Sequence, residues 1–355
     1  MKDEEYIEFL KSGISINSQL GCNVGCKYCI VGEFQKSVEK DYKPIQIIEK
    51  LKQHRFYNEN IPLIINNRSE PLSPLLKAET ISFLRLLKER NFKNPKILIS
   101  KLVFGKSDID VLDQNNVYIF RTISGMPASV EPPSNSENRR RILQENDHLK
   151  ENTNAKIIHY WRPIVRDLNS DDKILENIFS EVSSHFDGSV VSGIRVTPNI
   201  KLFMERLGAD LSDWNGDTNH KFLPQDVWNR ILDTRNKYNP NYLLFRHTSC
   251  IISYLNNHPD YNLHYCKAKN LKYCEICPFY TRCMNFVKEI DENELKACFT
   301  QLGKEFQYSI SDDQTLIIHS PIFQDEVSFL KMVLRYRIKA QDVQKSGSEK
   351  VLAYV

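Results

Sequence analysis

The sequence predicts an α/β protein: a partial (β/α)6 barrel of the TIM type, followed by a small cysteine-rich α+β extension. Short apolar runs of strand length alternate with longer amphipathic stretches over roughly the first 200 residues. Strands separated by helices pair in parallel, through right-handed crossovers. The nine cysteines fall into two groups, one directly after the first strand and one beyond residue 249.

Six strands are predicted, in the order that such a barrel requires. The first is a run of alternating apolar and polar residues at 14–20, and the second is a continuous apolar run of the buried parallel type at 62–66. The other four are 96–100, 117–122, 156–161 and 189–196. Active groups gather at the carboxyl ends of parallel strands, so we expect the site in the loops that follow these strands.

Helical segments fill the intervals between the strands. They are predicted at 44–55, where Pro44 suits the first turn, and at 75–90, 108–112, 136–150 and 170–186. The alternation loosens after residue 200. A polar loop, a helix, a strand, a cysteine-bearing loop and a terminal unit of two strands and a helix are expected at 205–220, 225–238, 242–245, 250–284 and 305–337. The predicted domains are therefore a barrel core at 1–200 and an extension at 201–355.

Composition excludes several classes of protein. Hydrophobic residues make up 41% and charged residues 26%, which is ordinary globular usage. No apolar run approaches the roughly 18 residues that span a bilayer, and the acidic start lacks the apolar core of a signal peptide, so we expect a cytoplasmic protein without a membrane partner. The net charge of only +3 is not the global electrostatic footprint of a nucleic-acid-binding protein.

The first cysteine group has the chemistry of an open metal site. Cys22, Cys26 and Cys29 are spaced C-x3-C-x2-C, and grouped thiolates select zinc or an iron–sulfur cluster. Structural zinc takes four ligands, but no His or further Cys follows within the next twenty residues. A [4Fe-4S] cluster held by three thiolates leaves one iron open to a ligand. The alternative is three unrelated buried thiols.

This spacing, with the aromatic Tyr28 before the last cysteine, resembles the motif of the radical S-adenosylmethionine (SAM) superfamily. The resemblance implies an enzyme in which the open iron chelates the amino and carboxylate groups of SAM. Reductive cleavage of SAM then gives a 5′-deoxyadenosyl radical that abstracts hydrogen from a substrate. The resemblance also implies a reductant such as flavodoxin or ferredoxin, and a partial (β/α)6 barrel is the core fold of that superfamily.

The loop after the second strand is the first candidate for SAM binding. Asn67, Arg68, Ser69 and Glu70 precede Pro71, where the superfamily usually carries a Gly-Gly-Glu-Pro-like segment that binds the SAM amino group. Glu70 and a backbone carbonyl would accept hydrogen bonds from that ammonium. Arg68 and Ser69 replace the glycines, which is a departure from the pattern. The alternative is an ordinary polar loop.

Basic residues at later strand ends are further candidates: Lys101 and Arg121 for SAM, and Arg162 for SAM or the substrate. An arginine suits the SAM carboxylate because its planar fork pairs bidentately, although Lys101 and Arg121 are equally compatible with a surface polar role. The Arg162-Pro163-Ile164 turn, together with Glu131-Pro132-Pro133 before an arginine-bearing helix, resembles the spore photoproduct lyase branch of the superfamily. The arginine run 139–141 favours a solvated helix face over a nucleic-acid patch.

The second cysteine group predicts a second metal site. Cys266, Cys274, Cys277 and Cys283 resemble the ligands of the auxiliary clusters, called SPASM and Twitch, that are appended to radical SAM enzymes. We predict one further [4Fe-4S] cluster, because the later cysteines of the SPASM type are missing. Zinc and unligated thiols are the alternatives. Cys250 is an alternative fourth ligand, a substrate-facing thiol or a buried cysteine, and burial is the default.

The sequence thus predicts a radical SAM enzyme acting on a peptide or small molecule, in which the second cluster anchors the substrate or takes the electron left after hydrogen abstraction. The features shared with spore photoproduct lyase make nucleic acid or a nucleotide the alternative substrate, which the near-neutral charge disfavours. A rival from another class is an iron–sulfur binding or sensing protein that does not cleave SAM, and the glycine-poor loop at 67–70 favours it. No catalytic side chain is predicted.

Overall fold

A curved sheet of nine strands forms the centre of the computed structural model, which describes residues 6–31, 42–218, 220–266, 274, 277 and 279–345. The strand order is β1-β2-β3-β4-β5-β6-β7-β8, and β9 also pairs with β7. The bounds are β1 (Ile7–Leu10), β2 (Gly13–Ile16), β3 (Leu63–Ile65), β4 (Lys96–Ser100), β5 (Val117–Arg121), β6 (Lys156–Ile164), β7 (Gly188–Arg195), β8 (Lys221–Phe222) and β9 (Leu244–Phe245).

Strands β2 to β7 are successive parallel neighbours and correspond to the six predicted strands. The predicted partial barrel is therefore confirmed. Strand β1 was not predicted and forms an antiparallel hairpin with β2. Strands β8 and β9 both pair with β7, so the sheet continues beyond residue 200, the predicted end of the barrel core.

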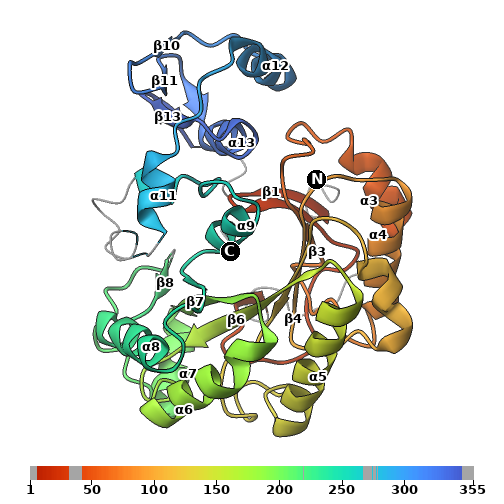
Figure 1. Cartoon of the computed structure of the whole chain (residues 1–355), viewed down its shortest axis with the longest axis vertical. Coiled ribbons are helices and arrows are strands. Elements are labelled where there is room, and N and C mark those ends of the chain that lie inside the picture. Colours follow the sequence, from red (N-terminus) through yellow and green to blue (C-terminus); the bar gives the residue numbers. More distant parts are fainter. Residues whose placement is uncertain are drawn as a thin grey trace.

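Helices cover the outer face of the sheet, as Figure 1 shows. They are α3 (Pro44–Leu51), α4 (Lys77–Glu89), α5 (Ser136–Asn152), α6 (Asp172–Asn177), α7 (Pro198–Arg206) and α8 (Gln225–Tyr238), with η1 (Lys106–Leu112) before β5 and η2 (Ile178–Val182) and η3 (Ser183–His185) after α6. Side-chain caps explain where α5, α6 and α7 begin, and they come from Asn135, Asp171 and Thr197. The side chain of Asn135 accepts a hydrogen bond from the Asn138 amide at the start of α5.

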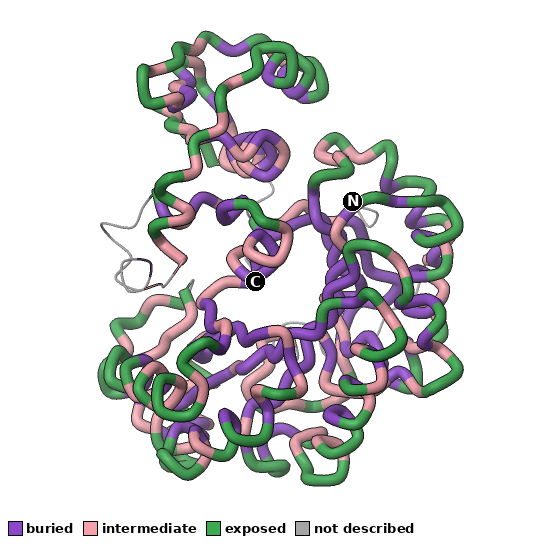
Figure 2. Tube along the Cα trace, in the orientation of Figure 1, coloured by how far each residue is buried: buried purple, intermediate pink, exposed green. Residues whose placement is uncertain are grey.

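The core lies between the sheet and these helices, and buried positions follow the strands closely (Figure 2). All five residues of β5 are buried, as expected for a parallel strand covered on both faces. A smaller apolar cluster, which includes Ile194 and Val196, lies beyond the carboxyl ends of the strands, and Tyr28 and Phe222 pack against it. This cluster joins the first cysteine loop to β8.

Helix α9 (Thr248–Leu255) lies beside β7 and β9 of the barrel, and the chain after it continues into a separate lobe in Figure 1. The later elements are α11 (Tyr280–Asn285), α12 (Glu292–Leu302), β10 (Tyr308–Ile310), β11 (Thr315–Ile318), β12 (Ile322–Phe323), α13 (Gln324–Leu334), β13 (Arg337–Ala340) and β14 (Val343–Gln344). The Gln301 amide ties α12 to the barrel by donating to the carbonyls of Arg55 (3.1 Å) and Tyr57 (2.7 Å). Within the described residues, no helix is both long enough and apolar enough to cross a membrane.

Gly193 permits the close approach of β8 to β7. A Cβ atom at this position would lie 1.7 Å from the Phe222 carbonyl oxygen. We expect Gly193→Ala to lower the free energy of unfolding by about 1–3 kcal/mol, because the overlap forces the backbone to shift. Chemical denaturation measures the change, and Ser192→Ala on the same strand is the control. A loss no larger than in the control would contradict this account of the strand pairing.

Candidate functional site

The first cysteine loop brings three thiols together directly after β2. Cys22, Cys26 and Cys29 are partly buried and free, and the Cys29 amide donates to the Cys26 carbonyl at 3.0 Å. Burial raises the pKa of Cys26 to about 12; the Lys101 charge opposes this rise, while Glu131 and the other two thiols add to it. Three cysteine side chains close to one cation are the kind of donor set that a metal cluster takes, because a bound metal lowers the pKa of its thiol ligands.

A second loop, between β5 and α5, holds the cysteine loop in place. The Lys27 amide donates to the Val130 carbonyl at 2.9 Å, and the Tyr28 hydroxyl donates to the Glu131 carboxylate. Lys101 Nζ lies 3.6 Å from Glu131 Oε2 and 5.8 Å from the centre of the Tyr28 ring. Glu131 was not among the predicted site residues, yet it fixes both Tyr28 and Lys101 at the thiols.

The two residues that replace the glycines of the 67–70 loop hold that loop to the N-terminal strands. Arg68 donates twice to the Glu8 carboxylate of β1, at 2.9 and 2.8 Å. The Ser69 hydroxyl accepts a hydrogen bond from the Gln19 amide at 2.9 Å. The Arg68 guanidinium is therefore engaged away from the thiols, which gives no support to its predicted contact with SAM. Asn67 is partly exposed.

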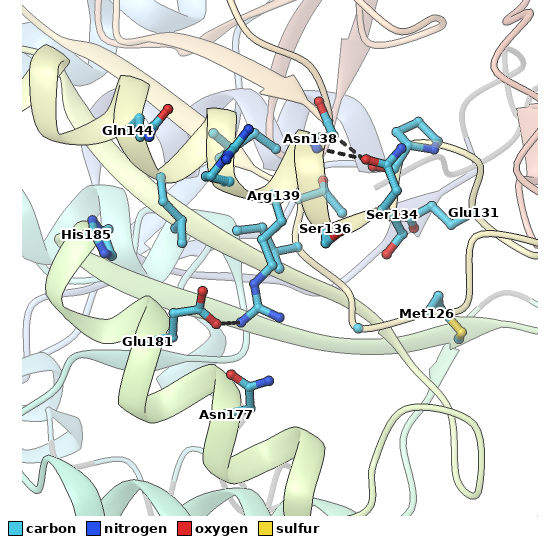
Figure 3. A pocket seen from close by; sticks show the side chains of 18 of the residues that line it. Met126, Glu131, Ser134, Ser136, Asn138, Arg139, Gln144, Asn177, Glu181 and His185 are labelled. Carbon is cyan, nitrogen blue, oxygen red and sulfur yellow. Dashed lines mark hydrogen bonds and ion pairs between the residues drawn. The ribbon is translucent and has the colours of Figure 1, made fainter.

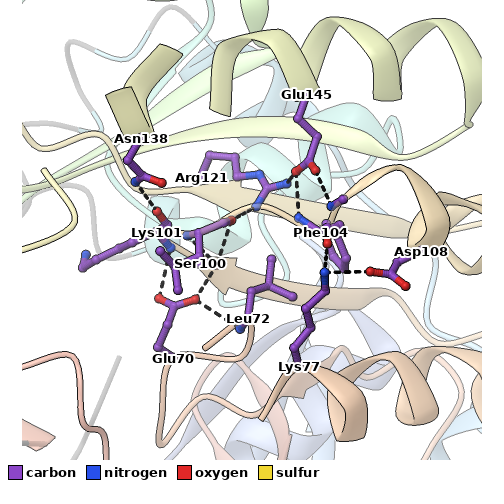
Figure 4. Close-up of polar contacts among 12 residues, drawn as sticks. Glu70, Leu72, Lys77, Ser100, Lys101, Phe104, Asp108, Arg121, Asn138 and Glu145 are labelled. Carbon is purple, nitrogen blue, oxygen red and sulfur yellow. Dashed lines mark hydrogen bonds and ion pairs between the residues drawn. The ribbon is translucent and has the colours of Figure 1, made fainter. Parts of the chain in front are cut away.

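Glu70 contacts the residues at the end of β4 (Figure 4), and its backbone lies within hydrogen-bond reach of the Cys22 thiol. Its carboxylate accepts hydrogen bonds from the Ser100 hydroxyl, the Lys101 amide (3.0 Å) and the Leu72 amide (3.2 Å). Burial raises the pKa of Glu70, and these hydrogen bonds oppose the rise. The Glu70 charge also raises the pKa of Cys22, after burial and Cys29. Glu70 is thus beside the predicted cluster.

Arg121 belongs to the scaffold of the site, as Figure 4 shows. Its side chain has no exposed surface and donates to the Leu102 carbonyl and to the Glu145 carboxylate of α5. Glu145 also accepts from the Phe104 amide at 3.0 Å. The predicted contact between Arg121 and SAM has no support in these interactions. Arg121 instead connects α5 to the loop after β4.

Arg162, by contrast, is partly exposed near the carboxyl end of β6. Its guanidinium carbon lies 4.6 Å from the centre of the Tyr160 ring, and it donates to the Tyr160 hydroxyl. Of the predicted basic residues, Lys101 and Arg162 therefore remain available to a ligand, and Lys101 is the one beside the thiols.

The second cysteine group lies at α9 and α11. Cys250, Cys274, Cys277 and Cys283 line one cavity, together with Asp260 and other residues. The Cys277 amide donates to the Cys274 carbonyl at 3.0 Å. Burial raises the pKa of Cys250 well above its usual range, and the charges of Asp260 and of the other three cysteines raise it further. Four cysteines that are up to 33 residues apart in the sequence thus line the same cavity.

Cys266 is not among the residues that line this cavity. It is exposed, and its thiol lies near Arg337 and Lys331 of the C-terminal region. The segment 267–273 between Cys266 and Cys274 lies outside the described residues. Cys266 as the fourth ligand remains a prediction, and the grouping of the side chains favours the alternative, Cys250.

A pocket of about 570 Å³ lies between α5 and the segment of α6, η2 and η3 (Figure 3). Arg139 and Glu181 form an ion pair in it, at 2.6 Å. Both helical segments cover the outer face of the sheet, so most of its lining lies away from the thiols. Glu131 is the lining residue that also contacts the cysteine loop.

Comparison with known proteins shows what fold this is. No family model matches the chain, and no curated protein does. A spore photoproduct lyase mutant with bound AdoMet and dinucleoside spore photoproduct is 11% identical, with a TM-score of 0.51, over 67% of this chain and 78% of that one. A complex of the lyase with the dinucleoside gives 13% identity, the same coverages and a TM-score of 0.51.

The chain has the fold of spore photoproduct lyase. This confirms the barrel that the resemblance to the radical SAM superfamily implied. SuiB of Streptococcus suis bound to S-adenosylmethionine is also similar, at 10% identity and a TM-score of 0.45 over 67% of this chain. The match spans only 50% of the SuiB chain.

The buried pair of Arg121 and Glu145 predicts a stability difference. We expect Arg121→Met to lower the free energy of unfolding by about 3–5 kcal/mol, because it leaves Glu145 without its charged partner. The control is Arg230→Met, which breaks an exposed pair with Asp172 and costs less than about 1 kcal/mol. Denaturant unfolding of both variants measures this. Equal, small losses would contradict the scaffold role of Arg121.

Proposed function

We propose that this chain is a radical SAM enzyme. The observation that carries the proposal is the convergence of Cys22, Cys26 and Cys29 after β2, with Glu70 and Lys101 around them. The sequence offers no further Cys or His within twenty residues after Cys29, which suits a cluster with an open iron. The shared fold with a lyase that binds AdoMet supports the same assignment.

The donor set fits a [4Fe-4S] cluster, since three soft thiolates are held within one loop. When bound there, the cluster and SAM would supply a 5′-deoxyadenosyl radical after an electron arrives from flavodoxin or ferredoxin. Lys101 balances the thiolate charge and offers an ammonium to the SAM carboxylate. Glu70 offers a carboxylate to the SAM amino group, and its three hydrogen-bond donors hold it in position.

We further propose that a second [4Fe-4S] cluster is held by Cys250, Cys274, Cys277 and Cys283. Their shared cavity supports this ligand set. Zinc is the competing metal, because ligand atoms of Cys250, Asp260 and His264 lie within 4.8 Å of one another. However, His264 already shares a hydrogen bond with Asp260, at 2.6 Å, so both side chains have a partner without a metal.

The near-neutral charge favours a peptide or small molecule as the source of the abstracted hydrogen. A nucleotide or nucleic acid is the second candidate, because the similar lyase was crystallised with a dinucleoside. In either case the substrate would lie beyond the carboxyl ends of the strands, next to the cysteine loop.

The first cluster makes a prediction about composition and activity. Anaerobically reconstituted protein is expected to bind about eight irons and, with dithionite and SAM, to release 5′-deoxyadenosine. Replacing Cys22, Cys26 and Cys29 together by Ala removes half of the iron and all of this product, because the thiolates are the cluster ligands. Cys298→Ala, which changes a buried cysteine on α12, is the control. Full iron content in the triple variant would refute the assignment.

Substitution of Cys250 and of Cys266 tests which of the two is the fourth ligand of the second cluster. In the variant without the first cluster, we expect about four irons and a visible band near 400 nm that dithionite bleaches. Cys250→Ala is expected to abolish the band and Cys266→Ala to leave it, because only Cys250 lines the cavity with the other three cysteines. Iron analysis and absorption spectra measure both. The opposite pattern would restore Cys266 as the ligand, and bound zinc without iron would exclude the cluster.

A further inference from the structure

Four basic side chains gather where β6, β7 and β9 end and where β8 begins. Arg162 is near the end of β6, Arg195 ends β7, Lys221 begins the antiparallel β8 and Arg246 follows β9. The sheet brings them together, because β8 and β9 both pair with β7. All four side chains are partly buried.

This arrangement places like charges against one another. Arg195 and Lys221 are directly opposite in the β7–β8 ladder, a position in which equal charges destabilise a sheet. Burial lowers the pKa of Lys221 well below its usual range, and the charges of Arg162, Arg195 and Arg246 lower it further. Within the part of the chain that the structure describes, no carboxylate forms an ion pair with Lys221 or Arg162.

The guanidinium groups are held in defined positions. Arg162 stacks on Tyr160, Arg246 lies 4.8 Å from the centre of the Trp228 ring, and Arg195 Nε donates to the Thr218 carbonyl at 2.8 Å. Aromatic faces and a carbonyl orient these groups before a ligand arrives, which is the arrangement of a binding site.

The basic cluster lies between the barrel and the second cysteine group. His247 follows Arg246 and stacks on His264, with ring centres 3.8 Å apart. Arg246 and His247 also line a cavity with Cys250, Cys274 and Cys277. A molecule bound to the four basic residues would therefore lie in the position that the proposed function gives to the substrate.

SAM does not supply the negative charge that would balance Lys221 and Arg162. It carries one carboxylate, one ammonium and one sulfonium, so its net charge is positive. The substrate is the remaining source. A phosphate group carries about −1.5 to −2 near neutral pH and accepts the paired hydrogen bonds of arginine, whereas a single carboxylate carries only −1.

We propose that Arg162, Arg195, Lys221 and Arg246 bind a phosphomonoester or diphosphate group of a small-molecule substrate. The proposal rests on the radical SAM function given above, and it names the substrate class of that same site. The phosphate would anchor one end of the molecule and leave another part facing the cysteine loop, where hydrogen abstraction takes place.

Isothermal titration calorimetry of the reconstituted protein with pyrophosphate and with inorganic phosphate tests the proposal. We expect binding that weakens about tenfold or more in Arg162→Gln and in Lys221→Met, because each variant loses a charge-assisted contact. Arg230→Gln, on the exposed face of α8, is the matched control. No binding of either anion, or equal binding in all variants, would overturn the proposal. Citrate that binds as tightly as pyrophosphate would overturn the phosphate assignment.

Proton uptake provides a second readout, specific to Lys221. The charged and titratable groups around it are Arg162, Arg195, Arg246 and His247. A bound phosphate anion favours the charged form of Lys221 and raises its pKa, so binding at a pH above the pKa of Lys221 in the free protein takes up a proton, which Lys221→Met cannot do. Titrations in two buffers of different ionisation enthalpy measure this, and no uptake in the unmodified protein would overturn the role of Lys221.

The basal release of 5′-deoxyadenosine without substrate separates this inference from the proposed function. It is expected to persist in Lys221→Met, because the lysine contacts neither SAM nor the first cysteine group in this account. Loss of phosphate binding with retained basal cleavage supports the phosphate site. Basal cleavage without phosphate binding in the unmodified protein overturns the phosphate site alone, and absence of basal cleavage overturns the function.

Discussion

The confinement of three thiols to one short loop is the constraint on which the site depends. Burial raises the pKa of Cys22 and Cys26, and the charges of the neighbouring cysteines add to this rise, because thiolates repel one another. A metal cluster removes both costs, because it converts three repelling anions into ligands. The surrounding structure supports that outcome. Glu131 holds Tyr28 and Lys101 at the thiols and thereby fixes the loop before any cofactor binds.

A series of buried polar contacts connects the cysteine loop to β4 and α5 of the barrel. Glu70 accepts from the end of β4, and Arg121 connects the following loop to Glu145 on α5. Buried polar networks of this kind rigidify a structure, so they favour one arrangement of the strand ends. The second cysteine group and the basic cluster occupy the other side of the barrel mouth, where β8 and β9 extend the sheet. A substrate between the two groups would contact both.

Periodicity located the six parallel strands because strands buried on both faces are almost wholly apolar. Strand β1 lacks that signal, since Glu8 is there to pair with Arg68, and the two-residue β8 is too short to carry one. The predicted ends of the strands indicated where the site lies, but the sequence did not indicate which basic side chains face a ligand. Arg121 turns to Glu145, a pairing between distant segments that spacing does not contain. Likewise Cys250 joins the second group from another helix, outside the cysteine spacing.

Electron paramagnetic resonance of the dithionite-reduced protein, before and after addition of SAM, tests the open iron most directly. A Cys277→Ala variant isolates the first cluster. If Cys22, Cys26 and Cys29 hold a cluster with one iron free, SAM binds to that iron and shifts the g values of the signal. A spectrum that saturating SAM leaves unchanged would contradict a radical SAM site in this loop.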